Sequence, residues 1–133
     1  MPGLWDMHFH LCWMNNNDSL LFPVLLKNGI TGIRDMGGDL HIMNNFKSRM
    51  KNKMIIAPEI YGAGPILDGN PPVQPDFSLP LDDNSNIENL LDSLKNNGAE
   101  FFKVYSLIKE KQPTAIAAYC TTHNMTFEGH LSE

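Results

Sequence analysis

Segments with the hydrophobic spacing of β-strands alternate along the chain with segments that have the spacing of α-helices. Short apolar runs with alternating or β-branched residues predict strands, and apolar residues that recur every three or four positions predict helices. The predicted strands are 4–11, 30–35, 54–64, 99–106 and 125–130. The predicted helices are 19–28, 39–53, 85–97 and 113–123. This alternation predicts an α/β protein with a parallel sheet and helices packed outside it.

Turn and cap residues support these boundaries. Gly29 and Gly98 stand where glycines commonly end helices, and Ser85 with Glu88 has the spacing of a capping box that would begin the third helix. The segment 65–84 is rich in proline and has no periodicity, so we expect a long loop there. A loop of this length inside a compact domain is usually functional, and we expect it to shape a substrate pocket.

Five parallel strands are compatible with two architectures, and 1–133 is expected to form one domain in either case. One is an open, doubly wound sheet, and the other is part of a (β/α)8 barrel, which takes about 250 residues when complete. No glycine-rich phosphate loop follows the first predicted strand, so the dinucleotide-binding version of the open sheet has no support.

Composition narrows the classes of function. The net charge is -5 and no stripe of lysine and arginine is present, which argues against a nucleic-acid partner. No apolar run reaches the roughly 18 residues that a membrane span needs, so no membrane role is expected. The two cysteines, Cys12 and Cys120, are expected to be free thiols in a reducing compartment. The first residues lack the features of a signal peptide, so we expect a cytoplasmic protein unless the natural N-terminus lies upstream.

Two histidines at the end of the first predicted strand are the first candidate for chemistry. His8 and His10 flank Phe9, and side chains two residues apart on a strand point to the same face. Two neutral imidazoles side by side provide half of a site for a divalent metal. Asp6 has the same phase and is expected to orient them. Two ordinary loop histidines are the alternative, although the end of a barrel strand is where active sites lie.

Other polar residues occupy unusual positions on later strands. Lys103 lies inside a strand that should be buried on both faces, where a lysine is costly unless it is paired or neutral. His130 ends the fifth predicted strand, and either a structural or a catalytic role is open for it. Glu128 shares the inward phase of His130, and pairing with Arg34 or with a metal is the only account of it. His41 and His123 lie on predicted helices and are assigned to the surface or to capping.

The strand motifs together resemble the amidohydrolase superfamily, most closely its imidazolonepropionase-like and Xaa-Pro dipeptidase-like branch. The segments that carry the resemblance are PGLWDMHFHL (2–11), NGITGIRDMGG (28–38), IYGAGPILDG (60–69), GAEFFKVYS (98–106) and GH (129–130). They resemble the first five strand motifs of that family in order, and they span nearly the whole chain. The resemblance implies a partial (β/α)8 barrel, covering about strands 1 to 5.

The resemblance also implies a binuclear metal centre with two divalent ions, for which zinc is expected. His8 and His10 would bind one ion, a carboxylated Lys103 would bridge both, and His130 would bind the second. A hydroxide activated by the two metals would then hydrolyse a C–N bond in an amide, imide or cyclic amide. The expected partner is a small-molecule substrate, and the full-length form is expected to be a homo-oligomer.

Two departures from the family pattern leave alternatives open. The family has another histidine on strand six, an aspartate on strand eight and a small β-sandwich, and none of these lies within the 133 residues. The chain is therefore expected to carry only part of the site and to be poorly stable and inactive in isolation. A metal-binding chain without turnover, and a phosphotriester or lactone hydrolase of the same superfamily, remain alternatives.

Overall fold

Short parallel strands with helices beside them form the fold of the described chain. The computed structural model describes residues 2–14 and 17–130. The strands are β1 (Leu4–Phe9), β2 (Ile30–Asp35), β3 (Glu59–Gly62), β4 (Ile66–Gly69), β5 (Ser78–Leu81), β6 (Phe102–Val104) and β7 (Phe127–Gly129). The helices are η1 (Leu11–Trp13), η2 (Asn17–Leu21), α1 (Phe22–Lys27), α2 (Leu40–Lys51), α3 (Ile87–Asn96) and α4 (Lys111–His123).

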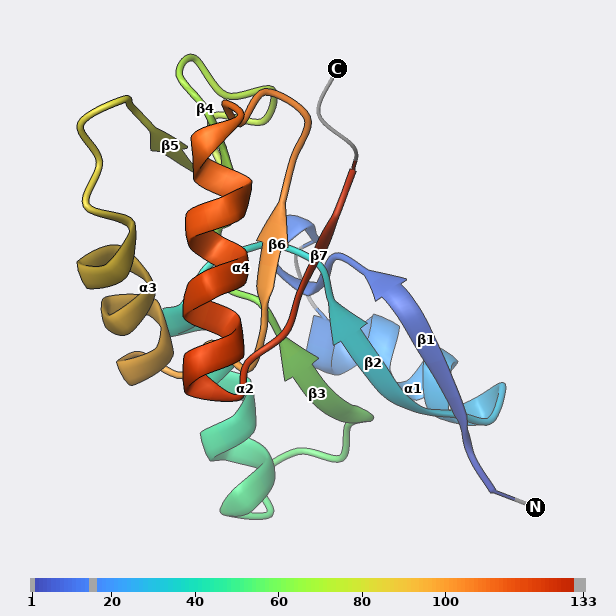
Figure 1. The fold of residues 1–133 in the computed structure, drawn as a ribbon. Helices are drawn as coiled ribbons and strands as arrows, with labels where there is room; N and C mark the ends of the chain where they lie inside the picture. The colour runs from blue at the N-terminus through green and yellow to red at the C-terminus, as the bar shows by residue number, and fades with distance from the viewer. Residues whose placement is uncertain (1, 15–16, 131–133) are drawn as a thin grey trace.

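The strands form two parallel sheets that are joined where the chain passes from β3 to β4 (Figure 1). The first sheet has the order β1-β2-β3 and the second the order β5-β4-β6-β7. The backbone N–H of Ala63 donates to the carbonyl of Asp35 at 3.0 Å, and that of Glu100 donates to the carbonyl of Gly62 at 2.9 Å. The β3–β4 segment is therefore bonded to the first sheet on one side and to the second on the other.

This order decides between the two architectures left open by the sequence. β1 lies at an edge of its sheet, whereas a doubly wound fold places its first strand in the interior. With β3 and β4 taken as one interrupted strand, the chain order β1, β2, β3–β4, β6, β7 is also the spatial order. The predictions of an α/β protein and of sequential parallel strands are confirmed.

The prediction of a structureless loop over 65–84 is wrong, because the segment contains β4 and β5. All four residues of β4 are buried, so it has no exposed face and no polar alternation to reveal it. β5 contains Pro80, which a strand tolerates best at an edge, and β5 is the edge strand of its sheet.

Helices α3 and α4 each start two residues away from the predicted position. Asn86, not Ser85, caps α3, because its side chain accepts a hydrogen bond from the N–H of Asn89 at 3.1 Å. The hydroxyl of Ser85 instead accepts from the N–H of Asp82 at 2.8 Å. The capping box is therefore wrong. The last helix begins at Lys111, two residues before the expected start at Pro113.

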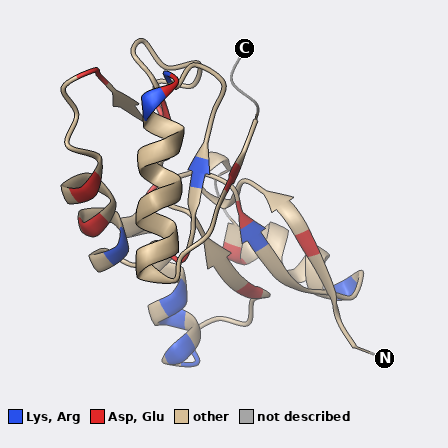
Figure 2. Cartoon of the chain, in the orientation of Figure 1, with Lys and Arg blue, Asp and Glu red and all other residues tan. Residues whose placement is uncertain are grey.

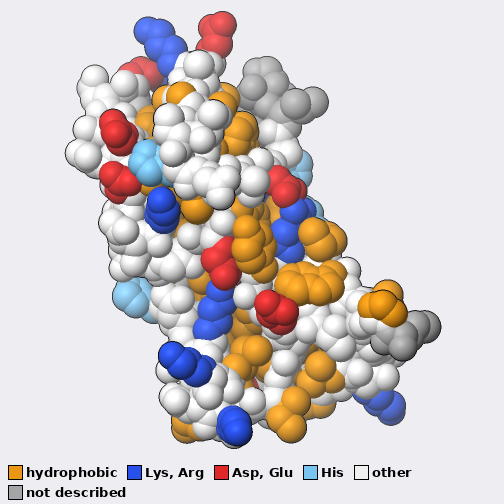
Figure 3. Space-filling model, turned by 60° about the horizontal axis from the view of Figure 1, so that its bottom comes forward, with side chains coloured by type: hydrophobic (Ala, Val, Ile, Leu, Met, Phe, Trp, Pro, Cys, Tyr) orange, Lys and Arg blue, Asp and Glu red, His pale blue; other side chains and the backbone are white. Residues whose placement is uncertain are grey.

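The hydrophobic core lies between the sheets and the helices and includes Phe22, Ile33, Leu67, Phe102 and Ile116. Hydrophobic side chains also remain exposed on β1, where Leu4, Trp5 and Met7 are 56%, 43% and 51% accessible. Figure 3 shows such side chains on the face at the bottom of the view in Figure 1. Cys12 and Cys120 are both free thiols, as predicted. Among the helices of the described residues, none has the length and apolar character needed to cross a membrane.

A buried carboxylate joins the ends of β4 and β6. Asp68 is 0% exposed, and its oxygens accept hydrogen bonds from the backbone N–H groups of Gly69, Val73 and Leu107 at 2.9, 2.7 and 2.9 Å. Gly69 is the last residue of β4, and Val73 and Leu107 lie in the loops that follow β4 and β6, so the carboxylate supplies acceptors where the strands end. Asp68 thereby fixes two loops at the same end of the sheet.

We expect Asp68→Ala to lower the free energy of unfolding by about 2–3 kcal/mol, because the buried N–H of Gly69 and the partly buried N–H groups of Val73 and Leu107 lose their acceptor. Urea denaturation of the purified protein measures this loss. Asp83→Ala is the matched control, because Asp83 is 71% exposed and pairs only with Lys109 among the described residues. Its effect should stay within about 0.5 kcal/mol. Equal losses in the two variants would contradict the anchoring role of Asp68.

Candidate metal centre

His8 and His10 lie at the carboxyl end of β1 and their rings are in contact. The ring centroids are 5.3 Å apart, and the planes meet edge to face at 69°. His8 is the last but one residue of the strand and is exposed, whereas His10 lies one residue past the strand and is half-buried. This contact is consistent with the expectation that both side chains point to the same face of the strand.

His10 carries an unsatisfied nitrogen. Its Nδ1 is buried and has no hydrogen-bond partner among the described residues. Burial lowers the pKa of His10 below its ordinary value, and the charges of His8 and Lys103 lower it further, while the backbone of Gly37 acts in the opposite direction. The neutral imidazole that results can offer a nitrogen lone pair to a metal, which a protonated ring cannot.

Lys103 lies at the centre of β6 and is only 2% exposed. Strands β4 and β7 flank it, with Ile66 and Glu128 as its paired residues. Burial lowers the pKa of Lys103, the charge of Arg34 lowers it further, and the charge of Glu128 raises it. The Nζ atom lies 3.3 Å from Nδ1 of His130. The buried lysine expected from the sequence is therefore present, with an imidazole as its neighbour.

His130 directly follows β7 and lies against the same group of side chains. Its ring meets the ring of Tyr105 edge to face, with centroids 4.4 Å apart. Desolvation lowers the pKa of His130, and the charges of Lys103 and His8 add to that effect. The charges of His8 and Lys103 also lower the pKa of His10, so both residues lie near His10 as well as near His130.

Asp6 and Glu128 have other partners than the histidine rings. Asp6 accepts a hydrogen bond at 3.0 Å from the backbone N–H of His8, so it holds the strand end rather than a ring. Glu128 forms an ion pair with the guanidinium of Arg34, one of the two pairings left open by the sequence. Figure 2 shows the positive segments on β2 and β6 and the negative segment on β7 that belong to this region.

The described residues do not form a complete metal site. Nowhere in 2–14 and 17–130 do three His, Cys, Asp or Glu side chains gather closely enough to hold a metal ion. The unpartnered Nδ1 of His10 and the contact between its ring and that of His8 nevertheless fit a ligand pair for an ion. Lys103 and His130 fit a second pair once the lysine carries an acceptor.

Sequence reasoning missed residues that hold these side chains in place. Asp35 is 2% exposed, and its carboxylate accepts a hydrogen bond at 3.0 Å from the N–H of Leu11, next to His10. Burial raises the pKa of Asp35 to about 6. Trp13 stacks on the ring of His10, with centroids 4.0 Å apart. The spacing of Trp13, three residues after His10, could have indicated this stack. It does so only if a tight turn directly follows the strand.

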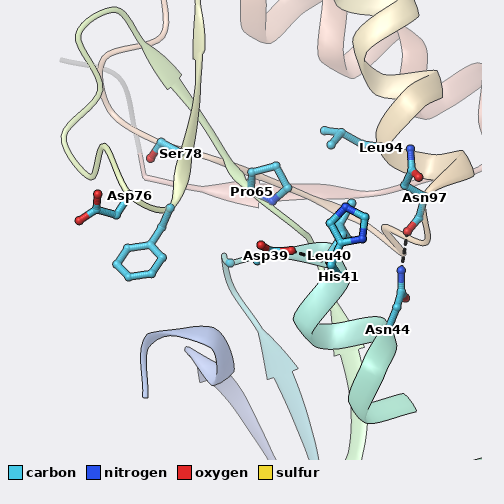
Figure 4. Close-up of a pocket in the computed structure, with 11 residues that line it drawn as sticks. Asp39, Leu40, His41, Asn44, Pro65, Asp76, Ser78, Leu94 and Asn97 are labelled. Carbon is cyan, nitrogen blue, oxygen red and sulfur yellow. Dashed lines mark hydrogen bonds between the residues drawn. The ribbon is translucent and has the colours of Figure 1, made fainter. Parts of the chain in front are cut away.

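A cavity of about 360 Å³ lies outside this cluster, between the start of α2, the end of α3 and residues 76–78 (Figure 4). Its lining includes Asp39, His41, Asp76 and Phe77, but none of the four predicted ligands. His41 therefore lies at a surface cavity, in keeping with its predicted surface position. His123 stacks on Tyr119 at the end of α4, with centroids 3.9 Å apart.

Comparison with known proteins relates this fold to amidohydrolases. No protein-family model and no curated protein sequence matches the chain. Among solved structures, bottromycin amidohydrolase matches with a TM-score of 0.82 and 18% identity over 99% of this chain and 28% of its own. A prolidase complexed with N-methylphosphonate-L-proline matches with a TM-score of 0.79 and 17% identity, over 98% and 43%. A Xaa-Pro dipeptidase with bound methionine in the active site matches at 0.73 and 15%, over 98% and 43%.

These likenesses establish the fold. The chain has the α/β architecture of part of an amidohydrolase barrel, so the fold expected from the five strand motifs is confirmed. It spans less than half the length of each of the three matched structures. The roles of His8, His10, Lys103, His130 and Asp6 remain predictions, because fold likeness alone assigns no ligand.

We expect the Arg34–Glu128 ion pair to stabilise the fold by linking β2 to β7. Arg34 is 14% exposed and Glu128 42% exposed in their side chains, and Nε of Arg34 also donates to the carbonyl of Met7 at 2.8 Å. A double-mutant cycle with Arg34→Gln and Glu128→Gln should give a coupling energy of about 1–2 kcal/mol in chemical denaturation. The more exposed ion pair of Lys109 and Asp83 should give a coupling energy of less than about 0.5 kcal/mol. Coupling energies that do not differ would contradict this link.

Proposed function

We propose that the protein is a metal-dependent hydrolase of C–N bonds in amides, imides or cyclic amides, and that this chain carries part of its site. One observation carries the proposal most directly: a lysine that is 2% exposed lies 3.3 Å from a histidine that directly follows a parallel strand. The carboxyl ends of the strands are where barrel enzymes keep their active sites. The solved structures of similar fold, an amidohydrolase and two peptidases, support the same class.

The chain's own residues would hold two divalent ions in two pairs. His8 and His10 form one pair, and Lys103 with His130 forms the other. Zinc is the expected metal, because it accepts imidazole nitrogen together with oxygen ligands. When bound, the two ions would activate water and polarise the scissile carbonyl of a small-molecule substrate.

Lys103 fits the bridging role only after modification. A protonated lysine has no acceptor, so it cannot bind a cation. Burial shifts Lys103 toward the neutral amine, whose nitrogen attacks CO2 to form an N–C bond as one N–H proton leaves to solvent. The resulting carbamate would be an anion whose two oxygens could accept metal ions.

Two other functions remain as candidates. Metal binding without turnover is the first, because the described residues offer two pairs of candidate ligands and not a complete set. Phosphotriester and lactone hydrolysis would use the same ligands on a different substrate. The cytoplasmic location and the homo-oligomeric state are further predictions, and both concern the full-length protein.

We expect Lys103→Ala in the full-length protein to lower the rate of hydrolysis by more than about 100-fold. Substituting a residue that only orients a metal ligand already lowers metal affinity or activity by about 10- to 100-fold. A short carboxylic acid added to this variant should restore part of the rate, since its oxygens can replace those of the carbamate. Activity against Xaa-Pro dipeptides and cyclic imides, with metal content by mass spectrometry, gives the measurement. Lys109→Ala, which removes a surface lysine, is the control. A Lys103→Ala variant with normal rate and metal content would rule out the bridging role.

The chain of 133 residues alone should show no measurable hydrolysis of the same substrates with zinc or cobalt added. The described residues bring two pairs of ligands together but no cluster of three acidic, thiol or imidazole groups. Turnover that disappears with a chelator and returns with metal would contradict this expectation, and would show that the ligands within the chain suffice.

A further inference from the structure

We infer that Trp13 is a positioning residue that fixes the imidazole of His10, and that Phe77 supports it from the segment between β4 and β5. Trp13 is not among the predicted ligands, and no metal or substrate contact is assigned to it. The inference concerns the orientation of one ring, and it rests on the proposed function only where metal affinity is measured.

Local geometry brings the two rings together. His10 directly precedes η1, a 3₁₀ turn that runs from Leu11 to Trp13. In a 3₁₀ turn, side chains three residues apart lie over one another. The two rings accordingly stack, with centroids 4.0 Å apart and planes 21° from parallel. The His-x-x-Trp spacing thus becomes a ring contact only because β1 ends at Phe9 and this turn follows.

The indole is itself held at two further points. Its Nε1 donates a hydrogen bond at 3.1 Å to the carbonyl of Gly37, and its rings stack on Phe77 with centroids 4.5 Å apart and planes 17° from parallel. Gly37 has a φ of 143°, and a Cβ there would come within 2.4 Å of Ile66. The backbone that anchors the indole is therefore confined to glycine by its conformation and by its surroundings.

Two observations indicate that this contact orients His10 and does more than fill space. Trp13 is 37% exposed, so burial of its own surface is incomplete. Nδ1 of His10 has no hydrogen-bond partner among the described residues, and the backbone of Gly37, which acts on the ring of His10, also accepts the hydrogen bond of the Trp13 indole. The stack on Trp13 and the edge contact with His8 are the ring contacts that restrain the imidazole.

Phe77 links this restraint to a segment far along the sequence. It directly precedes β5, and it also lines the cavity beside the start of α2. A change in the segment between β4 and β5 can therefore alter the orientation of His10 through Phe77 and Trp13, without touching a ligand.

The test compares Trp13→Leu, Trp13→Phe and Phe77→Leu in the full-length protein, with Trp5→Leu as the matched control. Trp5 is the other tryptophan of the chain, is 43% exposed, and packs near Gly32 rather than the histidines. The first measurement uses metal-free protein with labelled histidine rings. NMR should show a ring-current shift of His10 that disappears in Trp13→Leu and persists in Trp13→Phe and in Trp5→Leu.

The second measurement is the dissociation constant for Co²⁺ by chelator competition. We expect weakening of about 10- to 100-fold in Trp13→Leu, as for other residues that orient a ligand, and a smaller loss of the same sign in Phe77→Leu. Trp13→Phe should stay within about threefold, because it keeps an aromatic face. Circular dichroism checks that each variant is folded. If Trp13→Leu is unfolded, the His10 shift and the Co²⁺ affinity of Phe77→Leu and Trp13→Phe test the positioning role instead.

Each outcome bears on one of the two proposals. An unchanged His10 shift and Co²⁺ affinity in folded Trp13→Leu would overturn the positioning role. Equal weakening in Trp5→Leu would overturn it as well, because the effect would then be general destabilisation. If the unsubstituted protein binds no Co²⁺, the proposed hydrolase fails, while the metal-free NMR measurement still decides whether Trp13 orients His10.

Discussion

Backbone hydrogen bonding through the β3–β4 segment is the constraint on which the rest of the structure depends. This segment is paired with β2 on one side and with β6 on the other, so it joins the two sheets. Parallel pairing places the carboxyl ends of neighbouring strands at the same edge. His8 on β1 and Lys103 on β6 come from different sheets, and they reach the same region only because this segment connects them.

Burial then determines the chemical character of that region. Lys103 lies inside a strand whose three residues are all buried, and desolvation is the main cause that lowers its pKa. Arg34 and Glu128 change the pKa of Lys103 in opposite directions, and their ion pair links β2 of the first sheet to β7 of the second. The region therefore combines a lysine and two histidines whose lowered pKa values favour their neutral forms with an ion pair whose charges offset each other.

Much of the fold was predictable because hydrophobic spacing reports directly on exposed faces. The strand 30–35 was predicted at its observed bounds, and the positive φ of Gly29 agrees with its place after α1. β4 was missed because it is buried on every side and has no pattern to detect. Among the predicted site residues, proximity of His8 to His10 followed from strand geometry. The contact between Lys103 and His130 depended on the register of β6 with β7, which no local pattern contains.

The buried carboxylate of Asp68 has a consequence for how this region can evolve. Its hydrogen bonds fix the backbone at Val73 and at Leu107, in the loops that follow β4 and β6. The start of each loop is therefore held in place whatever side chains the rest of the loop carries. Insertions and substitutions beyond Val73 can then accumulate without displacing β6 or its lysine. Selection can in this way change the shape of the outer wall while the group that would bind the metals is inherited intact.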